Sequence, residues 1–346
     1  MKIVTWNVNS IRQRLPRLLA LLERHQPDVI CLQETKVEDG VFPTMEIAAA
    51  GYDCATFGQR AYNGVAILSR VGLTDVRTGF DGNPVPEQAR VLAARAGDLD
   101  VVCVYVVNGK AVEDPAYATK LAWLDALRAW IAATFDPADP LVITGDFNIA
   151  PDDRDVWDAD LWRNKNLASA PERERLQALL DWGLTDLGRA AAGDVPGPFS
   201  FWDYTAGAFH KGWGLRIDLA LGTASVASRL DDVAVDREER KPSTGEGKPS
   251  DHAPVIVALR RGCSSTPTGS QGIWARWWSS TSDGHPSAAP SRRPARSRRV
   301  TFRAPSSWMW IATWPATRRR DRAGIRCRAP RPSRARWGRP ASPTMP

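Results

Sequence analysis

The sequence predicts an α/β protein in which two β-sheets pack face to face beneath outer helices. Short apolar runs that are typical of buried strands alternate with segments whose leucines recur at helical spacing. Several strands follow one another at short intervals with only Gly, Asn, Asp or Pro between them, which indicates antiparallel pairing. The chain has 346 residues, a length that allows one large domain or two.

The N-terminal half begins with a strand over 2–6 and an amphipathic helix whose apolar face includes Leu15, Leu18 and Leu22. Ser10 and Gln13 resemble a capping box at the start of this helix. Pro27 ends the helix, and the next segments expected to be strands are 29–32, 54–57, 65–68, 73–76, 91–94 and 101–107.

The following segment predicts a long helix over 115–134, because its leucines recur at helical spacing. The apolar run 141–143 predicts a buried strand. Pro171 suits the first turn of another helix, which Gly183 is placed to end. The last two predicted strands cover 217–221 and 255–259.

The composition changes abruptly near residue 262. Residues 263–346 contain 17 Arg and two Asp, a net charge of +15, whereas the whole chain carries +7; residues 1–262 therefore carry −8. This tail has seven Trp but almost no aliphatic side chains, so it cannot bury enough surface to fold. We expect residues 1–261 to form the folded domain and 262–346 to be disordered. The tail is either a basic arm for nucleic acid or the out-of-frame translation of a GC-rich gene.

Other features of the sequence exclude several classes of protein. Cys31, Cys54 and Cys103 are scattered in apolar contexts, which predicts neither a disulfide framework nor a zinc site. We find no signal-peptide pattern and no apolar run of transmembrane length, so we expect a cytoplasmic protein that does not enter a membrane. Because the folded part is acidic, it can bind a polyanion only through a local basic region or through metal.

The segment 144–151, Thr-Gly-Asp-Phe-Asn-Ile-Ala-Pro, follows the buried strand 141–143. Gly145 permits a turn there, and Pro151 prevents the strand from resuming. Asp146 and Asn148 flank an apolar Phe and are expected to face the same way, so that the carboxylate takes a proton from water while the amide holds a substrate oxygen. A plain turn would use the same residue types.

Polar residues stand at or just past the ends of many predicted strands; they are Asn7, Glu34, Tyr105, Asp146, Asn148, Asp218, Asp251 and His252. If these ends meet, they form a cluster of oxygen ligands with one imidazole, which suits Mg²⁺ or Mn²⁺ rather than zinc. Such a cluster favours phosphate-ester hydrolysis, in which Asp146 deprotonates water and His252 donates to a phosphoryl oxygen. Asp218 could hold His252 in one tautomer.

Several of these residues also have a purely structural interpretation. Asn7 and Asn9 are equally suited to bonding the backbone of a turn. Glu34, at the exit of a strand, has the position of a solvated surface acid. Asp218 follows Arg216 closely, and a buried ion pair between the two competes with a role in catalysis.

Five sequence blocks together resemble bacterial exodeoxyribonuclease III, the abasic-site endonuclease branch of the endonuclease/exonuclease/phosphatase superfamily. They are TWNVNS (5–10), LQETK (32–36), GDFNIAP (145–151), GLRID (214–218) and KPSDHAP (248–254), in the order of that family. The resemblance covers 1–261 and implies a four-layer α/β/β/α sandwich of two mixed sheets. It also implies a monomeric, magnesium-dependent phosphodiesterase that cuts duplex DNA 5′ to abasic sites, degrades or cleans 3′ ends and works in the cytoplasm at the nucleoid.

The same resemblance implies roles for individual residues. Glu34 resembles the principal metal ligand; the other implied ligands are Asn7, Asp146, Asn148 and Asp251. Asp146 also resembles the residue that activates water, Asn148 and Tyr105 those that contact the scissile phosphate, and His252 with Asp218 the histidine–aspartate pair. The implied substrate contacts are Asn9, Lys36, Arg216 and, in the wall of an abasic pocket, Phe201 or Trp202.

Two other hypotheses remain open on the sequence. The metal and Asp–His blocks are shared with phosphoinositide and sphingomyelin phosphoesterases, although the Phe-Ser-Phe-Trp-Asp-Tyr stretch at 199–204 favours the DNA branch. The second hypothesis is a binding protein that has lost its catalytic activity. The presence of all the acids and of His252 argues against it.

Overall fold

Two six-stranded sheets form the centre of the computed structural model, which describes residues 1–260. In spatial order the first sheet contains β11 (Leu230–Val235), β12 (Val255–Leu259), β1 (Lys2–Asn7), β2 (Val29–Gln33), β4 (Val65–Ser69) and β3 (Asp53–Phe57). The second contains β5 (Thr74–Thr78), β6 (Val91–Ala96), β7 (Leu99–Tyr105), β8 (Leu141–Asp146), β10 (Asp218–Thr223) and β9 (Leu184–Asp186).

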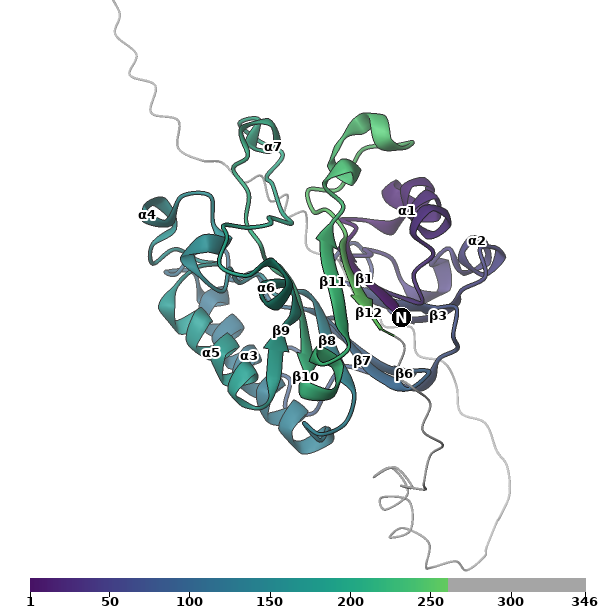
Figure 1. The fold of residues 1–346 in the computed structure, drawn as a ribbon, viewed down its shortest axis with the longest axis horizontal. Coiled ribbons are helices and arrows are strands. Elements are labelled where there is room, and N and C mark those ends of the chain that lie inside the picture. Colours follow the sequence, from purple (N-terminus) through teal and green to yellow (C-terminus); the bar gives the residue numbers. More distant parts are fainter. Residues whose placement is uncertain (261–346) are drawn as a thin grey trace, which may run out of the picture. The chain divides into compact units, whose positions relative to one another are not determined.

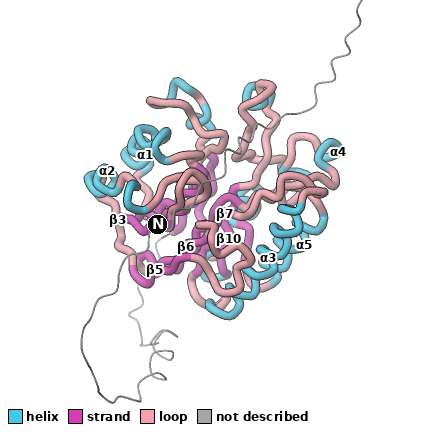
Figure 2. The backbone as a smooth tube through the Cα atoms, turned by 180° about the vertical axis from the view of Figure 1, so that it is seen from behind, coloured by secondary structure: helices cyan, strands magenta, loops and turns pink. Residues whose placement is uncertain are grey.

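Helices cover the outer face of each sheet (Figures 1 and 2). The first sheet carries α1 (Ile11–His25) and α2 (Thr44–Ala49), and the second carries α3 (Pro115–Thr134) and α5 (Ala170–Asp181). The short helices are α4 (Ala159–Trp162), α6 (Leu187–Ala192), α7 (Ala208–Lys211), α8 (Ala224–Ala227) and the 3₁₀ turns η1 (Asp39–Val41), η2 (Asp153–Asp155), η3 (Arg237–Arg240) and η4 (Pro242–Thr244). The predicted four-layer sandwich is confirmed.

One parallel strand pair lies inside each sheet, β1 with β2 and β7 with β8, while the other pairs are antiparallel. Parallel strands end at the same edge of a sheet. Asn7 is therefore paired with Gln33, and Tyr105 with Asp146. The antiparallel strand β10 begins opposite the end of β8, in the register Asp218 to Asp146. Strand ends from both sheets thus carry the polar residues that the sequence singled out.

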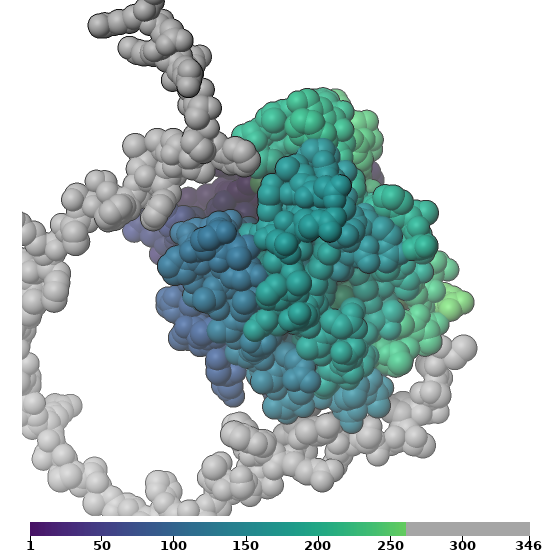
Figure 3. Space-filling view, turned by 90° about the vertical axis from the view of Figure 1, so that its left-hand side faces the viewer, coloured from purple at the N-terminus to yellow at the C-terminus, as the bar shows by residue number. Residues whose placement is uncertain are grey.

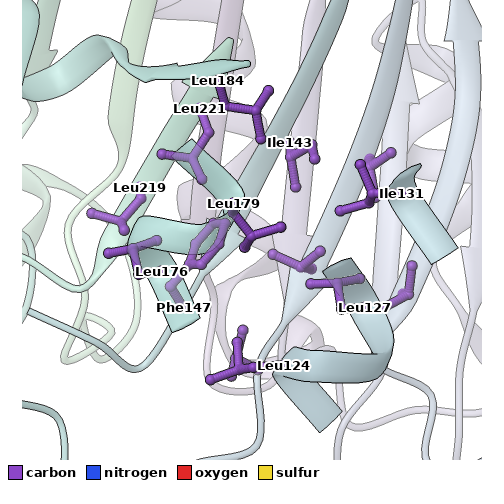
Figure 4. Close-up of a cluster of buried hydrophobic side chains, with 14 of the residues drawn as sticks. Leu124, Leu127, Ile131, Ile143, Phe147, Leu176, Leu179, Leu184, Leu219 and Leu221 are labelled. Atoms are coloured by element: carbon purple, nitrogen blue, oxygen red, sulfur yellow. The ribbon is translucent and has the colours of Figure 1, made fainter. Parts of the chain in front are cut away.

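The loop that follows β8 is anchored by Phe147, which is fully buried. Its ring packs with α3 and α5 among Leu124, Leu176 and Leu179 (Figure 4). Burying a side chain of this size contributes about 1.5–3 kcal/mol to stability. The alternation within Asp146-Phe147-Asn148 therefore sends the apolar ring into the helix-covered core and leaves the two polar residues on the other side.

Close contact between β7 and β8 requires glycine at position 145. Gly145 has φ +152°, and a Cβ built there would lie 1.9 Å from the carbonyl oxygen of Val104. That separation is far below van der Waals contact with a backbone atom that cannot move away cheaply. Gly145 thus allows Asp146 to lie directly beside Tyr105.

Some local expectations were wrong. Ser10 has φ 93° and makes no capping hydrogen bond with its side chain, so the predicted capping box is absent from α1. Two arginines of this helix, Arg14 and Arg17, are buried although the helical pattern assigned burial to leucines only. Strands β9 and β11 were not predicted, since β9 has three residues and β11 carries two exposed aspartates.

The predicted disordered tail over 262–346 lies outside the residues that the structure describes, which are the coloured ones in Figure 3. Within 1–260, no helix combines the length and the apolar character needed to cross a membrane.

Candidate active site

Two hydrogen bonds connect the strand ends of one sheet with those of the other. The Asn7 side-chain amide, at the end of β1, donates to Oδ2 of Asp146, at the end of β8, over 2.9 Å. The Tyr105 hydroxyl, at the end of β7, donates to Oε1 of Glu34, just past β2, over 2.6 Å. Four of the predicted residues are therefore brought together across the sandwich, although the sequence separation within each pair is 139 and 71 residues.

A second set of contacts joins the loops after β1 and β2 to the loop before β12. The Lys36 ammonium donates to Oδ1 of Asn9 over 2.6 Å and lies 3.6 Å from Oε2 of Glu34. The Asn9 side-chain amide in turn donates to Oδ1 of Asp251 over 3.0 Å. The predicted residues Asn9, Glu34, Lys36 and Asp251 thus form one polar group, with Asn7 beside it.

The imidazole of His252 lies between two buried carboxylates. Its Nδ1 is 2.8 Å and 3.1 Å from the two oxygens of Asp218, and its Nε2 is 3.8 Å from Oδ2 of Asp146. The Phe201 ring packs against the imidazole with a centroid separation of 4.9 Å. Asp218 therefore pairs with His252, and the competing ion pair with Arg216 is not formed.

Burial and charge act in opposite directions on this group. Burial alone would lower the pKa of His252, but the carboxylates of Asp218 and Asp146 outweigh it and raise this pKa to about 10. Burial raises the pKa of Asp146 to about 7, opposed by the positive charge of His252. The hydrogen bonds from Asn7 and from the Asn148 backbone also favour the ionised form of Asp146. The arrangement is a protonated imidazole held between carboxylates.

Asn148 is fixed in position by its neighbours. Its backbone N–H donates to Oδ1 of Asp146 over 2.9 Å, and its side-chain amide donates to the carbonyl of Val106 over 3.0 Å. Asn108, which the sequence analysis did not select, donates to Oδ1 of Asn148 over 2.8 Å. The signal was present, because Asn108 follows the end of β7 just as the other site residues follow their strands.

A buried ion pair supports the two asparagines from behind. The fully buried Lys120 ammonium of α3 donates to the backbone carbonyl of Asn148 over 2.7 Å and to that of Asn108 over 3.2 Å. It also pairs with Glu172 at the start of α5. The carboxylate of Glu172 accepts hydrogen bonds from the backbone of Leu167 and Ser169. Lys120 therefore holds both site loops against the two helices.

Replacing Lys120 with Met should lower the free energy of unfolding by about 3–5 kcal/mol, because Glu172 is then left charged and unpaired in the interior. Urea denaturation followed by circular dichroism measures this change. The double variant Lys120→Met, Glu172→Gln should recover part of the loss, since the amide oxygen still accepts from Ser169. A double variant less stable than the single one would contradict this account.

Four residues of the site have backbone conformations that side chains rarely adopt. Asn9, Glu34, Lys36 and Asn148 have φ of 43°, 54°, 57° and 51°. A left-handed residue other than glycine costs on the order of 1–3 kcal/mol and persists where its surroundings hold it. Such residues concentrate at functional sites. Their presence around one hydrogen-bonded cluster supports a functional role for this edge of the sandwich.

The chemistry of the side chains fits a hard divalent cation near Glu34. Oε1 of Glu34 accepts from Tyr105, while Oε2 lies beyond hydrogen-bond distance of the Lys36 ammonium. With Asp251 and Asn7, this gives carboxylate and amide oxygens, the donors that Mg²⁺ and Mn²⁺ prefer.

A second candidate set, Asp146, Asp218 and His252, has ligand atoms within 4.8 Å of one another. Both oxygens of Asp218 already face Nδ1 of His252. These three residues are better suited to handling a proton and a negative charge than to binding a cation.

Three predicted substrate contacts differ in their access to solvent. Arg216 is 4% exposed and pairs with Asp155 and Asp186, so its expected contact with substrate is corrected to a structural role. Trp202 is 2% exposed and packs under the loop of α7. Of the two predicted pocket aromatics, Phe201 is the one that is partly exposed and touches His252.

Comparison with known proteins identifies the family of this chain. The model of the endonuclease/exonuclease/phosphatase family matches residues 4–252. Exodeoxyribonuclease III of Haemophilus influenzae is 33% identical over 271 residues, which cover 75% of this chain and 100% of that protein. The 3′ phosphatase NExo of Neisseria, solved with product DNA hairpin, is 40% identical with a TM-score of 0.72, covering 75% of this chain and 100% of that one. An AP endonuclease of Archaeoglobus fulgidus is 34% identical with a TM-score of 0.71, covering 75% and 99%.

The matched span contains the whole hydrogen-bonded cluster from Asn7 to His252. The named relatives are hydrolases that act on DNA, and each is covered almost completely. The chain therefore belongs to the endonuclease/exonuclease/phosphatase family, as a hydrolase of its exodeoxyribonuclease III-like branch of DNA-repair nucleases.

Proposed function

We propose that this protein is a magnesium-dependent phosphodiesterase that acts on duplex DNA. It cuts 5′ to abasic sites, removes nucleotides from 3′ ends and cleans blocked 3′ ends. The observation that carries the proposal is the meeting of Glu34, Asp146 and His252 at one edge of the sandwich, where each is held by hydrogen bonds or charge. The DNA-acting relatives support this substrate over inositol phosphates and sphingomyelin. We propose that the protein works as a monomer in the cytoplasm, at the nucleoid.

In the proposed reaction, a water oxygen attacks phosphorus in line with the bond to O3′. That bond breaks, and the leaving O3′ takes a proton from solvent to become a 3′-hydroxyl. Asp146 accepts the proton of the water, as its position and its pKa of about 7 suit a general base. The protonated Nε2 of His252 faces the same side as Oδ2 of Asp146 and stabilises the charge that develops on a phosphoryl oxygen. Asp218 fixes the orientation of this imidazole through Nδ1.

Tyr105 and Asn148 are proposed to hold the scissile phosphate. Burial and the charge of Glu34 raise the pKa of Tyr105 well above its usual range, so its hydroxyl stays protonated. In the structure this hydroxyl donates to Glu34, and it would turn from Glu34 to donate to the phosphate. Asn148 is held from three directions, which means that it presents a fixed rather than a mobile amide. Groups that are positioned before the substrate binds lose little entropy during the reaction.

Glu34, Asn7 and Asp251 would hold the divalent cation, which neutralises negative charge on the reacting phosphate when it is bound. Asp146 and Asn148 were also predicted as ligands. In the proposed reaction Asp146 acts on the water and Asn148 on the phosphate, and both are held for these roles by hydrogen bonds from Asn7, Asn108 and the Asn148 backbone.

A duplex with one abasic site tests the proposal. With Mg²⁺, the full chain should cut the lesion strand once, on the 5′ side; a chelator should lower the rate more than about 100-fold, because a catalytic cation stabilises the transition state by several kcal/mol. A 3′-phosphorylated duplex and an inositol phosphate should be compared in parallel by product analysis. Hydrolysis of the inositol phosphate but of neither duplex would refute the assignment to DNA.

A further inference from the structure

Two tryptophans and a lysine form a stacked group that the proposed chemistry does not use. The rings of Trp157 and Trp213 are stacked, with centroids 4.8 Å apart and planes inclined by 18°. The Lys211 ammonium lies over the Trp213 ring, 4.1 Å from its centroid. Both tryptophans are partly exposed and Lys211 is exposed. We call these three residues the aromatic ledge.

The ledge is close to the catalytic group along the chain and in space. Phe201, which packs against His252, exchanges backbone hydrogen bonds with Leu215. Trp213 precedes Leu215 by two residues, so their Cα atoms are at most about 7 Å apart. The backbone N–H of Trp157 donates to the carbonyl of Gly214 and fixes the second tryptophan beside the first.

The composition of the ledge matches what single-stranded nucleic acid requires. Unpaired bases stack on aromatic rings, and a neighbouring cation pairs with their phosphates. Residues 1–262 carry a net charge of −8, and Lys211 places a positive charge directly on the aromatic face.

Magnitudes decide whether a base can take the place of the ammonium on Trp213. An exposed cation–π contact contributes about 2- to 5-fold to an equilibrium. A base stacked on an aromatic side chain contributes about 5- to 150-fold. The stack is the stronger interaction, and Lys211 is a long, flexible side chain. A base can therefore displace the ammonium, which then remains close enough to pair with a phosphate.

We propose that Trp157, Trp213 and Lys211 bind an unpaired nucleotide next to the scissile phosphate. The proposal rests on the proposed action on DNA and specifies its substrate: a duplex whose 3′ end carries one or two unpaired nucleotides. The base stacks on the tryptophan pair, and Lys211 contacts its phosphate. A duplex end without unpaired nucleotides makes only the phosphate contact.

Binding is measured with the full-length chain carrying Asp146→Asn, so that the DNA is not cut. Fluorescence anisotropy compares a labelled blunt duplex with the same duplex carrying two unpaired 3′ thymidines. Adding Trp213→Ala should weaken binding of the unpaired end about 10-fold and of the blunt end less than 2-fold. Trp213→Leu, which keeps an apolar side chain but no π face, should behave like Trp213→Ala, and Trp213→Phe should retain the preference.

The matched control is Trp182→Ala, which removes a partly exposed tryptophan at the end of α5, in the outer helix layer. This variant should bind both ends like the parent chain. If Trp213→Leu weakened binding of the unpaired end and the blunt end equally, or weakened neither, the proposed role of the aromatic ledge would be wrong. Because binding is measured without cleavage, this result stands apart from the cleavage assay: a chain that binds unpaired ends but cuts no DNA would refute the proposed function alone.

Discussion

Asp146→Asn is expected to lower the rate of cleavage at an abasic site by about 10³-fold, within the range of 10²–10⁴ typical of a lost general base. The amide has nearly the shape of the carboxylate but cannot accept the proton of the attacking water. Single-turnover cleavage of an abasic duplex at saturating protein measures the chemical step directly, separate from product release.

Two further measurements separate a loss of the chemical step from a loss of DNA binding and from a general effect of removing an acid. Affinity for the uncut duplex should change by less than about 3-fold, because Asp146 is only 2% exposed and contributes little surface for DNA. Glu113→Gln, which removes an exposed acid in the loop before α3, serves as the matched control and should cleave normally. Cleavage by Asp146→Asn within 10-fold of the parent rate would show that another group activates the water.

Glu34→Gln is expected to lower cleavage at a low Mg²⁺ concentration on the order of 100-fold or more, because the substitution removes the central negative charge of the proposed cation site. Additional Mg²⁺ should restore part of the rate. The measurement is the cleavage rate as a function of Mg²⁺ concentration, in which the half-saturating concentration should rise while the rate at saturation falls less.

Tyr105, which donates a hydrogen bond to Glu34, offers a way to separate binding of the cation from positioning of the phosphate. Tyr105→Phe keeps both carboxylate oxygens of Glu34 but removes the hydroxyl that is proposed to contact the phosphate, so it should slow cleavage even at saturating Mg²⁺ and raise the half-saturating Mg²⁺ concentration less than Glu34→Gln does. Glu38→Gln, an exposed glutamate four residues along the chain, should change neither quantity. If Glu34→Gln lowered the rate equally at every Mg²⁺ concentration, Glu34 would have to be reassigned from the cation to the phosphate or to structure.

The sequence was informative about secondary structure where the signal was local. The helix Pro115–Thr134 and the strand Val255–Leu259 have the predicted bounds, because apolar periodicity and the flanking Pro or polar residues are properties of one segment. The sequence was not informative where the burial of a side chain depends on a partner in a distant segment. Lys120 is a polar position on an apolar helix, and only its pairing with Glu172 makes its burial possible.

The site could likewise be predicted from local patterns only in part. Polar residues at strand ends could be selected from the sequence, and the structure brings most of them together. It could not be known whether Asp218 pairs with Arg216 or with His252, because that choice depends on the register of β10 against β8. Whether Phe201 or Trp202 reaches the site depends likewise on which ring the loop of α7 covers.

By itself the sequence determined most of the strands and the long helices, and which acids, amides and imidazole are available for chemistry. Only the tertiary structure decided their partners: Asn7 with Asp146, Tyr105 with Glu34, and His252 between two carboxylates. The physical reason is that periodicity acts over a few residues, whereas these contacts join side chains 34 to 139 residues apart. Their distances are set by strand register and by the packing of one sheet on the other.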